Sequence, residues 1–447
     1  MHPVRLLMNS ADNPKPTARI GLWRTTSLVA GNMIASGIFL LPVSLAHFGS
    51  ISLIGWLVSG IGAFVLALMY ARLSAAYPGA SGGPYAFTRE GLGSFAAFLV
   101  AWSYWVSIWS TNAAIALTFV SYLSVFLPAL AGQSELALFT AIGTVWLLSW
   151  VNTRGIPVAG SLQLLTTVLK IMPLLLLSFL GLFFLDSENF SAFNVSGDSH
   201  LAAITATATL TLFAFLGLEC ATIPAGSVEQ PEKTIPQATL LGTGLVTAIY
   251  ILGTVSVMGI LSPEDLRNST APFSDAAASI GGEQARYWMA GGAVISTFGA
   301  LNGWILMQGQ MPMAAAADRL FPESFGRLNR FGVPAASIIG SSVLISVLLI
   351  MKFSSSLSEM FESVILLSTM TVLVAYLLSS ASWLVVSVRS NVAQKSGSVL
   401  IGILAFGYSM WALIGSGPDA VYWGIVSVFA GVPLYALRRR KTKSLEG

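Results

Sequence analysis

The sequence predicts an all-α membrane protein with twelve transmembrane helices, and three observations predict this class. Of the 447 residues, 55% are hydrophobic and only 9% are charged, whereas an average soluble domain carries about 25% charged residues. Apolar stretches of about 20 residues, long enough to cross a bilayer as a helix, recur along the whole chain. The alternating ten-residue segments of a transmembrane β-barrel are lacking.

The predicted spans are separated by short polar or glycine-rich stretches. Their limits are 21–45, 49–74, 95–128, 134–152, 157–185, 202–225, 236–261, 286–316, 333–352, 361–388, 398–416 and 420–437. Spans three, eight and ten are longer than the bilayer requires, so we expect them to tilt or to protrude. Residues 1–20 precede the first span and are mostly polar, without the features of a signal peptide.

The distribution of lysine and arginine supports this arrangement. With a cytoplasmic N-terminus, eighteen of the 22 basic residues fall on the cytoplasmic side, three (Arg267, Arg286 and Lys352) fall outside, and Lys170 lies within a span. Such an excess on the cytoplasmic side follows the positive-inside rule. We therefore expect both termini in the cytoplasm, with the basic tail 438–447 at the lipid headgroups.

Several functional classes have no support in the sequence. The three histidines, His2, His47 and His200, lie near ends or loops, and no zinc-protease, nucleophile-elbow or phosphate-loop motif occurs. We therefore expect no enzymatic activity, no metal site and no cofactor. No long basic run is interleaved with aromatic residues, so nucleic-acid binding is not expected. The single cysteine, Cys220, excludes an intrachain disulfide.

Two predicted spans contain glycine and small or polar residues at their centres. Span one carries Gly31-Asn32-Met33-Ile34-Ala35-Ser36-Gly37, and span six carries Phe213-Ala214-Phe215-Leu216-Gly217-Leu218-Glu219. Each glycine weakens a helix by about 1 kcal/mol relative to alanine. Because these spans are the first members of two five-span sets, the pattern predicts an inverted repeat with broken first helices.

Unwound backbone at these two places offers groups that can bind a polar solute. The N–H groups near Ser36 and Gly37 lie at the positive end of the following half-helix, where a carboxylate is favoured. The carbonyl groups of residues 214–217 are expected to hold an ammonium group. The alternative is that the small residues only permit close packing of helices.

Four segments carry a resemblance to a known family. Residues 31–42 resemble the first-helix signature of the amino acid–polyamine–organocation superfamily, and residues 81–86, 229–236 and 315–322 resemble its later motifs in the same order. The resemblance covers nearly the whole chain and is strongest to bacterial arginine/agmatine, lysine/cadaverine and ornithine/putrescine antiporters. It implies a five-plus-five inverted repeat with broken helices 1 and 6 plus two extra helices. The family usually forms homodimers and exchanges substrates by alternating access.

The resemblance also implies an organisation along the chain. Residues 1–20 form a cytoplasmic segment, and residues 438–447 form the cytoplasmic tail. The transport core covers residues 21–390, with its two repeats at about 21–185 and 202–388. The last two spans lie within residues 391–437. The implied location is the bacterial inner membrane. The implied partners are the lipid bilayer, an amino acid or polyamine, protons and a second copy of the chain.

Substrate-binding residues follow from the resemblance one position at a time. Asn32, Ile34, Ser36 and Gly37 match first-helix positions that receive the substrate carboxylate and α-amino group. The other matching positions lie in spans three, six, eight and ten: Tyr104, Ser107, Asn112, Phe213, Leu216, Trp304 and Ser368. The asparagine suits a guanidinium or amine head, and the tryptophan suits an aliphatic stem. Alternatively, the aromatic residues serve only packing, and the asparagine only bonds to another helix.

Two ionisable residues, Lys170 and Glu219, lie deep in the predicted spans. A charge there costs at least about 2.5–3.5 kcal/mol, so each is a functional candidate. The resemblance links Glu219 to gating and proton sensitivity and Tyr376 to the cytoplasmic-side gate. At Lys170 the arginine antiporter has a small residue, whereas proton-dependent relatives that carry neutral amino acids have a lysine. The alternative for Lys170 is structural pairing with backbone carbonyls or Glu219.

The expected function is secondary active transport of an amino acid or polyamine, as an antiporter or with proton coupling. The alternative is a channel or a substrate sensor on the same fold. A fixed cation at Lys170 would repel a dicationic substrate, and Phe213 replaces a tryptophan of the arginine antiporter. The choice between cationic and neutral amino acids therefore stays open.

Overall fold

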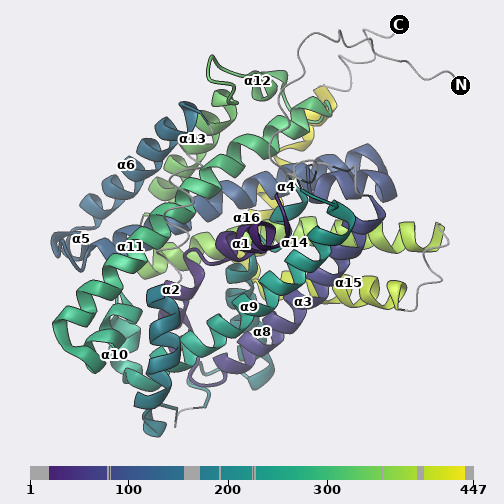
Figure 1. The fold of residues 1–447 in the computed structure, drawn as a ribbon. Helices are drawn as coiled ribbons and strands as arrows, with labels where there is room; N and C mark the ends of the chain where they lie inside the picture. Colours follow the sequence, from purple (N-terminus) through teal and green to yellow (C-terminus); the bar gives the residue numbers. More distant parts are fainter. Residues whose placement is uncertain are drawn as a thin grey trace, which may run out of the picture.

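The computed structural model describes residues 20–77, 80, 82–155, 172–190, 193–223, 225, 228–353, 356–389 and 397–437. Within these residues the chain is nearly all helical (Figure 1). The helices are α1 Leu22–Met33, α2 Gly37–Ala46, α3 Ser52–Ala76, α4 Pro84–Leu123, α5 Ala129–Gly132, α6 Ser134–Thr153, α8 His200–Leu212, α9 Pro231–Ile260, α10 Pro263–Asn268, α11 Pro272–Ala317, α12 Glu323–Gly326, α13 Ala335–Met351, α14 Leu357–Arg389, α15 Ser398–Gly415 and α16 Pro418–Phe429. Four short 3₁₀ turns accompany them: η1 Gly181–Phe184, η2 Ser187–Phe190, η3 Phe213–Phe215 and η4 Cys220–Thr222.

The helices confirm a multi-pass membrane protein. In the described part of the chain, ten helical segments are long and apolar enough to cross a bilayer, with the two halves of each broken span counted together. Two shorter apolar helices, Met172–Phe184 and α13, fall in predicted spans five and nine. The described apolar segments therefore follow the predicted order of spans. The first half of span five, including Lys170, lies outside the described residues.

Span one is broken over three residues. Helix α1 ends at Met33 and α2 begins at Gly37, and between them Ile34 leaves the helical region with ψ 84°. The break is narrower than the Gly31–Gly37 stretch expected from the sequence, because Gly31, Asn32 and Met33 remain in α1. A glycine inside a helix lowers its stability without ending it.

Span six is also broken, at the matching place. Helix α8 ends at Leu212 and the chain continues through η3 and η4. Between these turns Leu216 is extended, with ψ 134°, and Gly217 has φ +99°. That backbone conformation is open to glycine at little cost and disfavours other residues. Gly217 therefore sets the point where the direction of this span changes.

Helices α4 and α11 share a feature that agrees with the inverted repeat. Each begins with proline at its first turn, Pro84 and Pro272, and each is interrupted by a glycine with positive φ, Gly93 at 83° and Gly282 at 71°. Each is therefore a short helix followed by a long one. The predicted spans 95–128 and 286–316 included only the long parts, because hydropathy marks the apolar stretch and not the helix before it.

The broken span one lies between two groups of helices (Figure 1). Helices α6, α11 and α13 lie on one side of α1, and α3, α8 and α9 lie on the other. Within the first group α13 packs on α6 and α11, and within the second α3 packs on α8 and α9. Helix α14 packs along α4. Spans one and six are thus enclosed by protein, where irregular backbone is tolerated in a membrane.

Helices α3 and α8 approach each other closely at Gly55. A Cβ atom on this glycine would lie 2.3 Å from Thr207 Oγ1 and 2.9 Å from the Thr207 backbone carbonyl carbon. Small residues are the usual means of close helix packing in membranes. The close approach of α3 and α8 therefore requires glycine at position 55.

Substitution Gly55→Ala should destabilise the protein by about 1–3 kcal/mol, since an added methyl group overpacks the contact. Thermal unfolding in detergent should show a lower midpoint. The matched control is Gly143→Ala on α6, where a Cβ would meet no atom within 4 Å. Equal midpoints for the two variants would contradict the proposed packing role of Gly55.

Candidate functional site

The two helix breaks meet at Gly37 and Ala214. A Cβ atom on Gly37 would lie 2.6 Å from Ala214 Cβ and 2.9 Å from Ala214 Cα. A Cβ on Gly217 would lie 3.3 Å from Asn32 Cβ and 3.4 Å from Trp304 Cζ2. Glycine at these two positions therefore lets the interrupted segments of spans one and six touch each other and the tryptophan of α11.

A small cavity lies between the two breaks. It is lined by Asn32, Met33, Ala35, Ser36, Gly37, Thr111, Phe213, Ala214, Leu216 and Trp304. Its volume is about 10 Å³, far below the 300–1,000 Å³ or so that is typical of small-molecule sites. A substrate of ordinary size therefore requires the lining segments to move apart.

The α2 side of the cavity offers hydrogen-bond donors. Ser36 is fully buried, and its hydroxyl has no partner among the described residues. The first backbone bond of α2 runs from Phe39 N to Ser36 O, at 3.1 Å. The N–H groups of Ser36 and Gly37 precede this bond and have no helical acceptor. Such a helix start favours a negatively charged group.

The carbonyl groups of the breaks are partly occupied. The Tyr250 hydroxyl of α9 lies within hydrogen-bond distance of Met33 O and of Ala214 O, the second at 3.1 Å. Phe215 O accepts from Leu218 N at 3.3 Å, and Gly217 O accepts from Cys220 N at 3.0 Å. The ammonium site expected at residues 214–217 therefore has fewer free acceptors than the sequence suggests.

Tyr250 bridges the two breaks and was not predicted from the sequence. It is fully buried and its ring packs on Trp56 and Phe215, with centroids 5.3 and 5.6 Å away. Nothing in its local sequence separates it from an ordinary packing aromatic. Its role becomes visible only when α9 is placed beside both breaks.

A second polar cluster joins three spans around Glu219. The hydroxyl of Tyr104 donates to Glu219 Oε1 at 2.6 Å, and that of Tyr376 donates to Oε2 at 2.7 Å. All three side chains are almost completely buried. The residues come from α4, the break of span six and α14, so the two tyrosines satisfy both oxygens of the carboxyl group.

Two predicted serines stand behind the cavity wall. Ser368 Oγ of α14 lies 2.7 Å from Thr111 Oγ1 and donates to Ser107 O at 3.0 Å. Thr111 lines the cavity, whereas the residue predicted from the sequence is its neighbour Asn112. Successive helical residues point about 100° apart, so sequence position alone left the choice between them unresolved. Asn112 bonds to Gln308 of α11.

The structure brings six of the predicted residues to the cavity wall: Asn32, Ser36, Gly37, Phe213, Leu216 and Trp304. Trp304 Nε1 donates to Asn32 O at 3.1 Å, which ties α11 to α1. Phe213 packs edge to face on Phe361 of α14, with centroids 6.0 Å apart. Ile34 is buried within the break of span one but is not among the lining residues.

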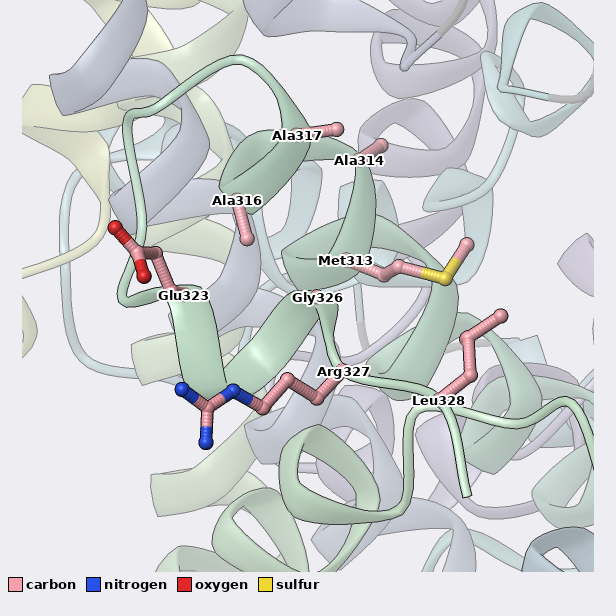
Figure 2. Close-up of a pocket in the computed structure, with 8 residues that line it drawn as sticks. All are labelled: Met313, Ala314, Ala316, Ala317, Glu323, Gly326, Arg327 and Leu328. Atoms are coloured by element: carbon pink, nitrogen blue, oxygen red, sulfur yellow. The ribbon is translucent and has the colours of Figure 1, made fainter. Parts of the chain in front are cut away.

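A larger hollow lies elsewhere, at the end of α11 (Figure 2). It is lined by Met313, Ala314, Ala316, Ala317, Glu323, Gly326, Arg327 and Leu328, with a volume of about 500 Å³. No residue of either helix break lines it. Size alone therefore does not identify the candidate site, and the smaller cavity is distinguished by its irregular backbone.

Substitution Tyr250→Phe should lower the thermal midpoint, because the two carbonyl groups lose their shared donor at a cost of about 1–3 kcal/mol. The matched control is Tyr408→Phe on α15. The Tyr408 hydroxyl is buried without a partner among the described residues, so its loss should leave the midpoint unchanged. Equal effects would show that Tyr250 does not bridge the breaks.

Comparison with known proteins places this chain in a family. The model of the amino acid permease family matches residues 20–435. A putrescine transporter, PotE, of Haemophilus influenzae is 33% identical over 420 residues, covering 93% of this chain and 96% of the relative. A cadaverine/lysine antiporter of Escherichia coli strain K12 is 34% identical over 334 residues, covering 74% of each chain. The chain belongs to the amino acid permease family.

Proposed function

We propose that this protein is an antiporter that exchanges basic amino acids and polyamines across the bacterial inner membrane by alternating access. The observation that carries the proposal is the meeting of two helix breaks at Gly37 and Ala214 around a buried cavity. The named cargoes of the relatives, putrescine, cadaverine and lysine, support a substrate with a primary ammonium group.

The substrate site in this proposal is the cavity between the breaks. Ser36 and the start of α2 hold the carboxylate of an amino acid. The rings of Phe213 and Trp304 contact the aliphatic stem. The other predicted residues contribute to the site or support its walls: Asn32, Ile34, Gly37, Tyr104, Ser107, Asn112, Leu216 and Ser368.

We assign gating and proton coupling to Glu219, Tyr376 and Lys170, and Tyr104 supplies the second hydroxyl partner of Glu219. In the described geometry both carboxyl oxygens accept a hydrogen bond from a tyrosine hydroxyl. A proton on Glu219 turns one oxygen into a donor, so that this oxygen can donate to a tyrosine hydroxyl instead of only accepting from it. Protonation is therefore linked to the contact between α4, span six and α14.

The organisation inferred from the sequence belongs to the same proposal. We assign residues 21–390 to the transport core, with repeats at about 21–185 and 202–388, and residues 391–437 to the two extra spans. Both termini lie in the cytoplasm, and two copies form a homodimer. The excess of basic residues on one side of the predicted spans supports this orientation.

Counterflow in proteoliposomes tests the proposed function. Vesicles loaded with unlabelled putrescine, cadaverine, lysine, ornithine, arginine or agmatine should take up the labelled form faster than empty vesicles, with saturation. A channel gives no such trans-stimulation, and a sensor gives no uptake. Absence of trans-stimulation with all six compounds would refute the proposal.

Substitution Lys170→Ala tests whether the fifth-span lysine couples protons. Since Lys170 is the other ionisable residue deep in the predicted spans, its removal should abolish the pH dependence of uptake while leaving the thermal midpoint near that of the wild type. Uptake from pH 5 to 8 measures this. Unchanged pH dependence would show that Lys170 does not couple protons and would leave Glu219 as the coupling group.

A further inference from the structure

Helix α14 carries a half-buried carboxylate, Glu362, that takes no part in the cavity or in the Glu219 cluster. It lies six residues before Ser368, whose hydroxyl bonds to Thr111 of the cavity wall. At 1.5 Å per residue, Glu362 is therefore about 9 Å from the level of the cavity, toward the start of α14. With both termini in the cytoplasm, this end of α14 faces the outside.

The second half of span one reaches the same place. Helix α2 begins at the cavity with Gly37 and ends at Ala46, and it packs on α14. Near its end, the buried hydroxyl of Ser44 donates a hydrogen bond to the Glu362 carboxylate. Helices α2 and α14 therefore both run outward from the cavity, and these two side chains join them beyond it.

An aromatic pair separates Glu362 from the cavity. Phe361, the preceding residue of α14, packs edge to face on Phe213, and Phe213 lines the cavity. Both rings are buried. Glu362 thus lies just beyond the ring contact, where a solute that arrives from the outer face meets a negative charge before it reaches the cavity.

The Glu362 carboxylate lacks the strong basic partner that other acids of the outer side have. Asp275 and Glu283 both form ion pairs with Arg286, at 3.2 and 3.7 Å. Within the described part of the chain Glu362 forms no ion pair with lysine or arginine, and the positive charge that reaches it comes from His47, exposed at the end of α2. A half-buried carboxylate with one hydroxyl donor keeps unused acceptor positions, and a cation is the partner that stabilises it.

We propose that Glu362 is an outer binding site for a primary ammonium group of the cargo, filled before the cargo enters the cavity. The inference rests on the proposed function and adds a second site to it. The three N–H donors of an ammonium group match the free lone pairs of the carboxylate. A diamine gains most from this site, because an amino acid also brings a carboxylate that Glu362 repels.

The test is Glu362→Gln, which removes the charge and keeps an oxygen that accepts from Ser44. Exchange of labelled putrescine and labelled lysine is measured in right-side-out and in inside-out membrane vesicles, so that each face of the protein is supplied separately. Thermal unfolding in detergent shows whether the variant folds as the wild type does.

Glu362→Gln should raise the outer-face KM for putrescine about five- to tenfold, between the value of an exposed ion pair and that of a hydrogen bond to a charged group. The outer-face KM for lysine should rise less. The inner-face KM, the maximal exchange rate and the thermal midpoint should stay near those of the wild type. An unchanged outer-face KM, or a rise seen equally or only from the inner face, overturns the proposal.

The matched control is Glu359→Gln, which removes a negative charge from an exposed position one turn earlier on the same helix. Water screens a charge at this position, so the outer-face KM should stay near that of the wild type. An equal rise in Glu359→Gln and Glu362→Gln would show that only the overall charge of the outer face matters, against a site at Glu362.

The variant Ser44→Ala separates binding from closure of the outer side. It keeps the charge of Glu362 and removes the hydrogen bond between α2 and α14, so the outer-face KM should stay near that of the wild type. If Ser44→Ala raises this KM as much as Glu362→Gln does, the contact between the helices explains both effects and the binding site is refuted.

Failure of the inference and failure of the proposed function give different results. If the wild type exchanges amines and Glu362→Gln keeps its outer-face KM, only the outer site is refuted. If the wild type exchanges none of the six amines from either face, the proposed function is refuted and the outer site with it.

Discussion

The close approach of two interrupted helices is the constraint on which the rest of the structure depends. Spans one and six each give up helical hydrogen bonds inside an apolar span, and they do so where Gly37 faces Ala214. Backbone of this kind is costly in lipid unless protein surrounds it. The surrounding helices provide that enclosure, and the freed groups give the cavity its polar wall.

The buried polar side chains are arranged to join different spans. Tyr250 links the two breaks, and Glu219 links α4 to α14. Gln308 of α11 accepts from Asn112 of α4 and donates to Ile338 O of α13. Each polar group in such a region needs a partner, so every pair fixes the relative position of two helices. A movement that opens the cavity must break or exchange some of these bonds, which connects recognition to alternating access.

Hydropathy predicted the class and the order of the spans, because lipid-facing helices carry a strong one-dimensional signal. Glycine patterns located both breaks but overestimated the first, since Gly31 stays helical. The sequence did not predict Tyr250 or Thr111 as part of the site, because their roles depend on which helices lie side by side. Lys170 lies outside the described residues and stays a prediction.

A cryo-electron microscopy structure with bound cargo tests the central claim most directly. The cargo should be the amine with the strongest trans-stimulation in counterflow. The account predicts its density between the breaks of spans one and six, in contact with Ser36, Phe213 and Trp304, and with the cavity expanded well beyond about 10 Å³. Density for the cargo only in the hollow at the end of α11 (Figure 2), or elsewhere away from both breaks, would contradict it.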